Sequence, residues 1–292
     1  MELELRRDGR TARVETLGGE LVSCRGEDGL EYIWGGDPAF WAGRNPLLFP
    51  VVGNVKDGKV SFGGRAYPME RHGFARRQEF RLTERGEDWL RLELTENPAT
   101  LAAYPYPFRL TVEQRLTDSG FATSISVANP GRAPMPFCLG GHTAYRCPLE
   151  EGEAFEDYEL LFPRRETCPT LLLRDGLLDR PAALPCLEDT DTLPLDYRWF
   201  DQLDTLIFEG LRSDSVTLRG KKSGRGVRVR FAGFPMLALW TMPGKRAPYL
   251  CIEPWHGCAA SWGEGPEFTD KAHCIVLEPG QSRTLAYQAE LL

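Results

Sequence analysis

Trp89-Leu-Arg-Leu-Glu-Leu94 alternates apolar and charged residues. Successive side chains of a β-strand point to opposite faces, so this stretch predicts a strand with one buried and one solvated face. A run at residues 80–83 is the expected partner across a short charged turn. Strand pairs with a single wet face are typical of antiparallel sheets.

Short β-prone runs continue through most of the chain. The clearest hairpin joins residues 60–62 to 65–67 across Gly63-Gly64, a two-residue turn suited to paired strands. A second hairpin joins residues 108–116 to 121–128. Further strands are predicted at residues 11–14, 21–25, 30–34, 205–208, 215–218, 227–231, 236–242 and 249–252, with a closing hairpin at 274–277 and 283–290.

Helix is scarce. Asn97 and Pro98 supply a capping residue and a first-turn proline, which predict one or two helical turns up to residue 103. Residues 163–204 are rich in proline, leucine and acids, and we interpret them as a long connection over the core with a small hairpin at 171–178. The expected fold is all-β with minor helix, one large antiparallel β-sandwich domain over residues 1–292; a barrel or propeller is the alternative.

The composition is that of an ordinary globular protein, with 42% hydrophobic and 26% charged residues. A net charge of −7 argues against nucleic-acid and anionic-membrane partners. No stretch has the length of a membrane span, the first residues are charged, and the eight cysteines include no C-x-x-C pair. The spacing of Cys138, His142 and Cys147 fits no common zinc site. We expect a cytoplasmic monomer or weak homodimer with no metal.

The stretch Tyr249-Leu-Cys-Ile-Glu253-Pro-Trp-His-Gly257 places a carboxylate where an apolar strand is expected to end. Pro254 lacks a backbone donor and favours an extended Glu253. A partly desolvated carboxylate beside Trp255 would have a raised pKa, which suits a base near neutral pH. The alternative is a structural carboxylate that caps a loop or pairs with an arginine.

Four histidines are the other candidates for proton transfer. His72 lies in an arginine-containing loop, and His142 follows two glycines after a buried strand. An imidazole and a carboxylate are the minimum set for paired acid and base catalysis. His256 is expected beside Trp255 in the same cleft, whereas His273 is expected to be structural. Surface or core hydrogen bonding is the alternative for His72 and His142.

Sequence motifs for other chemistries are missing. There is no G-x-S-x-G, no P-loop and no G-x-G-x-x-G before a helix, so serine hydrolases and nucleotide cofactors are disfavoured. Trp41, Trp255 and Trp262 lie in glycine-bearing stretches of the kind that stack on sugar rings. Core packing is the alternative for each tryptophan.

Four motifs occur in order: Asn45-Pro-Leu-Leu-Phe-Pro-Val-Val-Gly53, Arg71-His-Gly-Phe-Ala-Arg76, Gly140-Gly-His-Thr-Ala144 and Cys251-Ile-Glu-Pro-Trp-His-Gly257. Together they resemble the aldose 1-epimerase (galactose mutarotase-like) family over nearly the whole chain. The resemblance implies a large β-sandwich with an open cleft. It also implies interconversion of the α and β anomers of an aldose without cofactor or metal.

The same resemblance implies roles for individual residues. Glu253 would take the proton of the anomeric hydroxyl, His142 would protonate the ring oxygen, and His72 would hydrogen-bond near that oxygen. Asp204 is the best match for a carboxylate that binds sugar hydroxyls, with Asp201 the alternative.

One position departs from the family pattern. Asn54 stands where the family usually has an arginine, and an amide cannot supply that charged, two-pronged donor. Altered sugar binding is therefore expected, with Lys56 or Arg76 in compensation and Trp255 completing the substrate-binding set. For a phosphorylated hexose, the candidate phosphate ligands are Arg44, Arg71, Arg76 and Arg77.

Three functions remain open at this point. The first is a mutarotase for a free or phosphorylated hexose, with a bell-shaped pH profile and a histidine-like limb near ~6.5. The second is a non-catalytic carbohydrate-binding protein on the same fold. The third is a polysaccharide hydrolase or lyase, which would need a second acid near Glu253.

Overall fold

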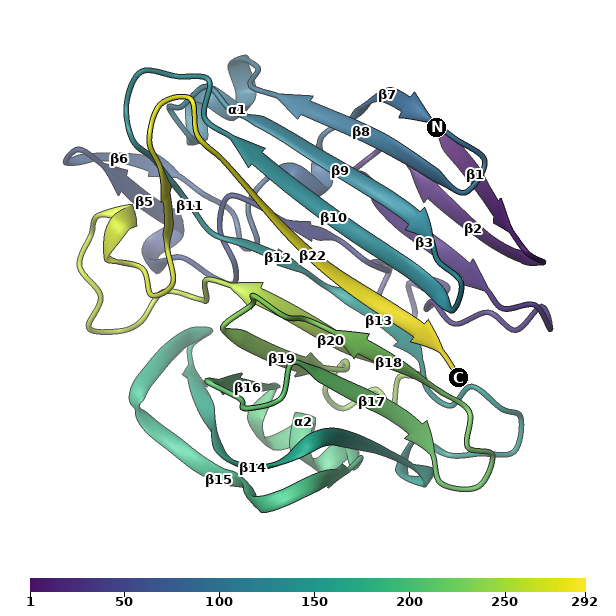
Figure 1. The fold of residues 1–292 in the computed structure, drawn as a ribbon. Coiled ribbons are helices and arrows are strands. Elements are labelled where there is room, and N and C mark those ends of the chain that lie inside the picture. Colours follow the sequence, from purple (N-terminus) through teal and green to yellow (C-terminus); the bar gives the residue numbers. More distant parts are fainter.

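The computed structural model describes residues 1–292 and consists mainly of antiparallel strands (Figure 1). The helices are α1 (Pro98–Ala103) and α2 (Tyr197–Leu203), with 3₁₀ turns at Lys56–Gly58, Ala75–Arg77, Phe155–Asp157 and Phe268–Asp270. The strands are β1 (Glu2–Arg7), β2 (Arg10–Glu15), β3 (Glu20–Arg25), β4 (Leu47–Leu48), β5 (Lys59–Phe62), β6 (Arg65–Pro68), β7 (Arg81–Arg85), β8 (Trp89–Thr95), β9 (Arg109–Leu116), β10 (Gly120–Ala128), β11 (Met135–Phe137), β12 (Leu139–Gly141), β13 (Thr143–Arg146), β14 (Tyr158–Arg174), β15 (Leu177–Pro194), β16 (Thr205–Glu209), β17 (Ser215–Gly220), β18 (Gly226–Arg230), β19 (Met236–Trp240), β20 (Tyr249–His256), β21 (Ile275–Leu277) and β22 (Ser282–Leu291).

Two large sheets form the sandwich. The longer one has nine strands in the order β15-β14-β17-β18-β22-β10-β9-β8-β7, and the other has the order β16-β19-β20-β12-β4 with β13 beside β20. Tyr287 of β22 contacts Thr143 of β13 across the interface, with 3.5 Å between their hydroxyl oxygens. One cluster of 71 buried residues fills the interior. The predicted all-β sandwich is confirmed.

Several predicted elements are confirmed as well. The hairpins β5–β6, β7–β8 and β9–β10 form, and alternate residues of β8 are buried as its pattern requires. Helix α1 begins after Asn97, whose side chain accepts hydrogen bonds from the amides of Ala99 and Thr100. Neither α-helix is long and apolar enough to cross a bilayer.

The interpretation of residues 163–204 as a connection was wrong. This segment forms most of β14 and β15, a long hairpin at one end of the nine-stranded sheet, followed by α2. Its prolines suggested a loop because proline interrupts central strands. Here β15 is an edge strand, and β14 pairs with β17 only from Tyr158 to Leu161, so the later prolines of β14 face no partner on that side. The small hairpin at 171–178 is the tip of this long one.

The prediction that residues 274–277 and 283–290 form a closing hairpin was also wrong. Strand β21 pairs with β11, whereas β22 lies between β10 and β18. Pairing with these distant strands buries Leu285, Tyr287 and Ala289 of β22. Residues 30–34 form only isolated bridges. Local turn signals therefore did not determine these partners.

Glu253 lies inside β20 rather than at its end. The strand continues through Pro254 to His256. On one side, β13 pairs with β20 up to Ile252, and β12 resumes the pairing at Trp255. The proline therefore falls at the gap between β12 and β13, where its missing N–H breaks no ladder bond on that side.

Candidate functional site

A cavity of about 60 Å³ opens beside this gap. It is lined by Gly53, Asn54, Arg71, His72, His142, Leu173, Gly176, Asp204, Thr205, Ile207, Trp240, Glu253, Trp255 and Ala259. Six of the eight predicted site residues are among them, drawn from distant parts of the chain. The volume has room for a few water-sized groups.

The gap between β12 and β13 brings His142 and Glu253 together. His142 is the single residue between these strands, so it falls opposite Glu253. Its Nε2 lies 3.3 Å from Oε2 of Glu253, and their side chains are only 8% and 2% exposed. The indole Nε1 of Trp255 donates a hydrogen bond of 3.2 Å to the same carboxylate oxygen. The carboxylate and the imidazole are thus held in contact away from bulk water.

Burial shifts the pKa values of this pair in opposite directions. It raises the pKa of Glu253 well above its ordinary value, opposed mainly by the positive charge of Arg71. It lowers the pKa of His142 to about 3, helped by the same arginine. Both shifts disfavour charge in a desolvated site. The contact at 3.3 Å allows Oε2 and Nε2 to share one proton, and the titration of the pair then belongs to both groups together.

His72 enters the cavity from the loop after β6. It is buried at a φ of 64°, and Gly73 follows at 70°, where a Cβ would collide with the carbonyl oxygen of Phe49. The amide of Gly53 donates to Nδ1 of His72 at 3.1 Å, which puts the proton of the neutral ring on Nε2. The Nε–H of Arg71 is directed at that Nε2 from 3.1 Å. A protonated Nε2 cannot accept that bond, so the guanidinium of Arg71 is left available, beside Nε2–H of His72, to an acceptor oxygen in the cavity.

Aromatic rings enclose His142. Trp41 packs on it with ring centroids 5.0 Å apart, and Trp240 approaches edge-on at 5.8 Å. Trp41 thus contacts the catalytic candidate itself, and its stacking on a sugar ring stays a prediction. Trp262 lies outside the cavity lining, where Arg174 packs over its ring. Trp240 was assigned in the sequence only to a central apolar strand.

Asp204 follows α2 in an unusual backbone conformation, with φ 62° and ψ −62°. Its Oδ2 accepts a hydrogen bond of 3.1 Å from the hydroxyl of Thr205, and it lines the cavity. Strained residues of this kind concentrate at ligand sites. Asp201 instead binds the amide of Gly244 and the side chain of Arg246, outside the cavity lining.

Asn54 lines the cavity, but its amide is engaged by protein. Its Nδ2 donates a hydrogen bond of 3.1 Å to the carbonyl of Gly176, at the tip of the β14–β15 hairpin. The amide N–H of Leu178, in the same hairpin tip, donates a hydrogen bond of 2.9 Å to the carbonyl of Ala260. The tip contributes Leu173 and Gly176 to the cavity wall. These wall residues were missed because the segment was interpreted as a connection.

Replacing Asn54 with alanine should loosen the hairpin tip. One hydrogen bond contributes about 0.5–1.5 kcal/mol, so amide exchange at residues 171–178 should rise about 2–10-fold. Hydrogen-exchange mass spectrometry measures this, with the β5–β6 hairpin as the internal control. Unchanged exchange at the tip would show that the Asn54 contact does not hold it.

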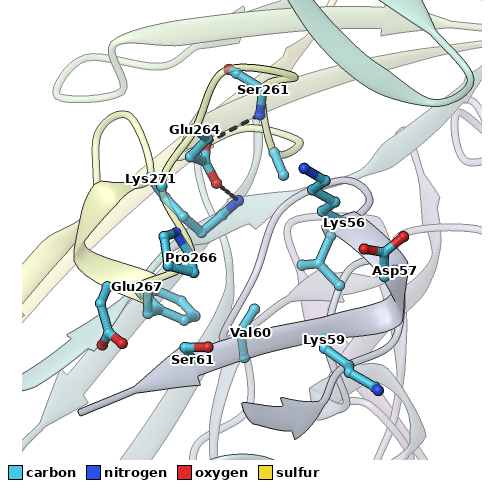
Figure 2. A pocket seen from close by; sticks show the side chains of 14 residues that line it. Lys56, Asp57, Lys59, Val60, Ser61, Ser261, Glu264, Pro266, Glu267 and Lys271 are labelled. Atoms are coloured by element: carbon cyan, nitrogen blue, oxygen red, sulfur yellow. Dashed lines mark hydrogen bonds and ion pairs between the residues drawn. The ribbon is translucent and has the colours of Figure 1, made fainter. Parts of the chain in front are cut away.

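Two predicted substrate-binding residues lie elsewhere. Lys56 belongs to a 3₁₀ turn after the cavity wall and lines a separate cavity of about 370 Å³ with Lys271 (Figure 2). In that view the amines of both lysines point into the same space. Arg76 is used within its own loop, donating to the carbonyl of Arg71 at 2.8 Å. Neither residue lines the cavity that holds Glu253 and His142.

The other charged candidates are also dispersed. His256 lies outside the cavity lining because residues 253 and 256 point to opposite faces of a strand; its Nδ1 contacts the carbonyl of His273 at 2.8 Å. His273 lies 2.5 Å from a carboxylate oxygen of Glu209. Of the four arginines considered for phosphate, only Arg71 lines the cavity. The others contact their own surroundings: Arg44 pairs with Glu15, Arg77 with Glu70, and Arg76 with its loop.

Comparisons with known proteins agree with this fold. The sequence model of the aldose 1-epimerase family matches residues 1–290. The plasmid-encoded protein LacX of Lactococcus lactis subsp. lactis is 37% identical, with both chains covered in full. The galactose mutarotase related enzyme of Lactobacillus acidophilus superposes with a TM-score of 0.95 at 26% identity, covering 100% of this chain and 97% of its own. A galactose mutarotase-like protein of Lactobacillus casei gives 0.94 at 27% identity, with full coverage of both.

Proposed function

The chain belongs to the aldose 1-epimerase family, and on that premise we propose that it interconverts the α and β anomers of a monosaccharide in the cavity beside β20. One observation carries the proposal: a buried carboxylate and imidazole lie 3.3 Å apart and line the same cavity. Anomer exchange requires one oxygen of the sugar to lose a proton while another gains one. A pair that shares a single proton can perform both transfers.

Ring opening follows from this arrangement. With the shared proton on Nε2 of His142, Glu253 takes the proton of the anomeric hydroxyl while His142 gives its own to the ring oxygen. The bond between C1 and the ring oxygen breaks, and an open-chain aldehyde forms. Nε2–H of His72 and the guanidinium of Arg71 stabilise the negative charge that develops on the ring oxygen. Asp204 accepts hydrogen bonds from other hydroxyls of the sugar.

Ring closure reverses these transfers. The C1–C2 bond of the aldehyde rotates and presents the other carbonyl face. The hydroxyl that was the ring oxygen attacks C1 and returns its proton to His142, while Glu253 protonates the new anomeric oxygen. The pair again holds one proton, so the cycle consumes nothing and needs no cofactor.

The test is direct. Freshly dissolved α-glucose, α-galactose and a panel of hexoses and hexose 6-phosphates are followed by polarimetry or NMR with and without the protein. Faster approach to anomeric equilibrium for at least one sugar is expected. Accelerated release of a reducing sugar from glycosides would instead support hydrolysis, for which Asp204 is a second carboxylate at the cavity.

A non-catalytic carbohydrate-binding protein is the second candidate. It is favoured by Asn54, because the family arginine is replaced and the amide is engaged by Gly176. Saturable sugar binding by calorimetry with no acceleration of anomer exchange would support it. The retained pair of Glu253 and His142 weighs against it, since binding alone does not need a matched acid and base.

The pH profile should differ from that of an exposed histidine. A second proton enters the pair only near the lowered pKa of His142, about 3, and blocks the base. The last proton leaves only above the raised pKa of Glu253, and then the acid is lost. The catalytic rate should therefore change less than about twofold between about pH 5.5 and 7.0, where an ordinary imidazole titrates. This flat profile differs from the histidine-like limb near ~6.5 that the sequence led us to expect. A change in kcat/KM that titrates near ~6.5 would contradict a proton shared by Glu253 and His142.

A further inference from the structure

Cys251 adds a third metal-ligand type to the acid–base pair. It lies two residues before Glu253 on β20, so both side chains project from the same face of the strand. The potential ligand atoms of His142, Cys251 and Glu253 all lie within 4.8 Å of one another. All three residues are buried, and the nitrogen of His142 that faces Glu253 is Nε2. The proposed reaction uses that nitrogen but not the thiol.

We propose that these three side chains form an inhibitory binding site for Zn²⁺. Thiolate, imidazole and carboxylate are the three ligands that zinc takes in proteins, and three protein ligands with a fourth open position are typical of accessible zinc sites. His142 and Glu253 line the cavity, from which water or a sugar hydroxyl would complete the coordination. The thiolate favours zinc over magnesium and calcium, which prefer oxygen ligands.

The geometry needs only a small adjustment. Zinc bonds of about 2.0–2.3 Å in a tetrahedron place ligand atoms about 3.3–3.8 Å apart. The contact between His142 and Glu253 already measures 3.3 Å. Cys251 must approach by about 1.3 Å or less, which side-chain rotation supplies. Cys251 packs in a small apolar cluster with Trp34 and Trp240, so it has no polar partner to give up.

Zinc and catalysis exclude each other at this site. On binding, the thiol releases its proton and the pair releases the one that it shares, so two protons leave and Zn²⁺ gains a thiolate, a carboxylate and a neutral imidazole. No electron is transferred. The metal then occupies the lone pairs that would exchange protons with the sugar. The inhibitory consequence rests on the proposed function, whereas the binding site itself does not.

The experiment uses the full chain, with Zn²⁺ from a buffered stock and Co²⁺ as a spectroscopic probe. Wild-type protein should lose anomer-exchange activity as zinc rises and regain it with a chelator, and Mg²⁺ should have no effect. Loss of even an outer-shell partner costs about 10–100-fold in metal affinity. Cys251→Ser should therefore keep its activity but need at least about tenfold more zinc for half-inhibition. Cys138→Ser is the matched control, a buried cysteine outside the cavity lining, and should be inhibited like wild type.

Binding is read separately from activity. Co²⁺ bound to wild type should show thiolate-to-metal charge-transfer absorption, which Cys251→Ser and Cys251→Ala both lose while their melting curves confirm folding. If wild type shows no cysteine-dependent cobalt spectrum, or if both Cys251 variants keep wild-type zinc sensitivity, the site is overturned. If the spectrum depends on Cys251 but no sugar is interconverted, the metal site stands and the mutarotase proposal fails.

Discussion

Replacing Glu253 with glutamine should slow anomer interconversion of a verified substrate by about 10²–10⁴-fold, the usual contribution of a positioned acid or base. Glutamine keeps the size of the side chain and an oxygen that can accept from Nε1 of Trp255. It cannot accept the proton of the anomeric hydroxyl, so the pair with His142 loses its base. NMR exchange between the two anomers measures the rate.

Glu166 provides the matched control. It is another buried glutamate, on β14, and lies outside the cavity lining. Its carboxylate accepts hydrogen bonds from the amides of Arg212 and Ser213. Glu166→Gln should keep the wild-type rate while lowering the free energy of unfolding by about 1–3 kcal/mol, as expected for weakened bonds to a buried carboxylate. If Glu253→Gln interconverts the sugar as fast as wild type, Glu253 is not the base.

Replacing His142 with glutamine should lower the rate by a similar factor, about 10²–10⁴-fold. A glutamine amide can hydrogen-bond to Glu253, but it cannot pass a proton to the ring oxygen. His256→Gln is the control, because His256 lies outside the cavity lining, and should retain the wild-type rate. Wild-type activity in His142→Gln would move the acid role to another group, with His72 the next candidate.

The effects of Glu253→Gln and His142→Gln on the rate of anomer exchange should not be additive. Glu253 and His142 act on one shared proton, and residues that act as a unit are strongly non-additive in their kinetic effects. The double variant should be about as slow as the slower single variant. A loss equal to the product of the two single losses would show that the residues act independently.

The sequence predicted those elements whose signal lies within a single short stretch of residues. Strand β8 alternates visibly, and α1 has its capping residue and proline, so both followed from the sequence. Strands β14 and β15 did not, because their prolines are harmless only where a ladder is missing on one side. The partner of β22 was unpredictable for a related reason: strand pairing depends on packing between residues more than 150 positions apart.

The cavity shows the same division. The motifs identified His72, His142 and Glu253, and these residues line one cavity. Asn54 and Lys56 are two positions apart, yet only Asn54 lines it, because the chain turns at residues 56–58. The role of Gly176 as a wall depends on how the β14–β15 hairpin lies across the molecule, which no local pattern encodes.

The gap between β12 and β13 also determines where the chain can tolerate a change in length. Two short ladders align this region with β20, one at Gly140 and one starting at Thr143, and a single residue lies between the two strands. Deleting or inserting one residue there would shift the register of one strand by one position, so that its side chains move to the opposite face of the sheet. The imidazole of His142 would then point away from the carboxylate of Glu253. The exposed turn at Gly63-Gly64 has no such restriction. Family members that share this chemistry should therefore vary in length at surface turns and keep the spacing from residue 140 to residue 143 constant.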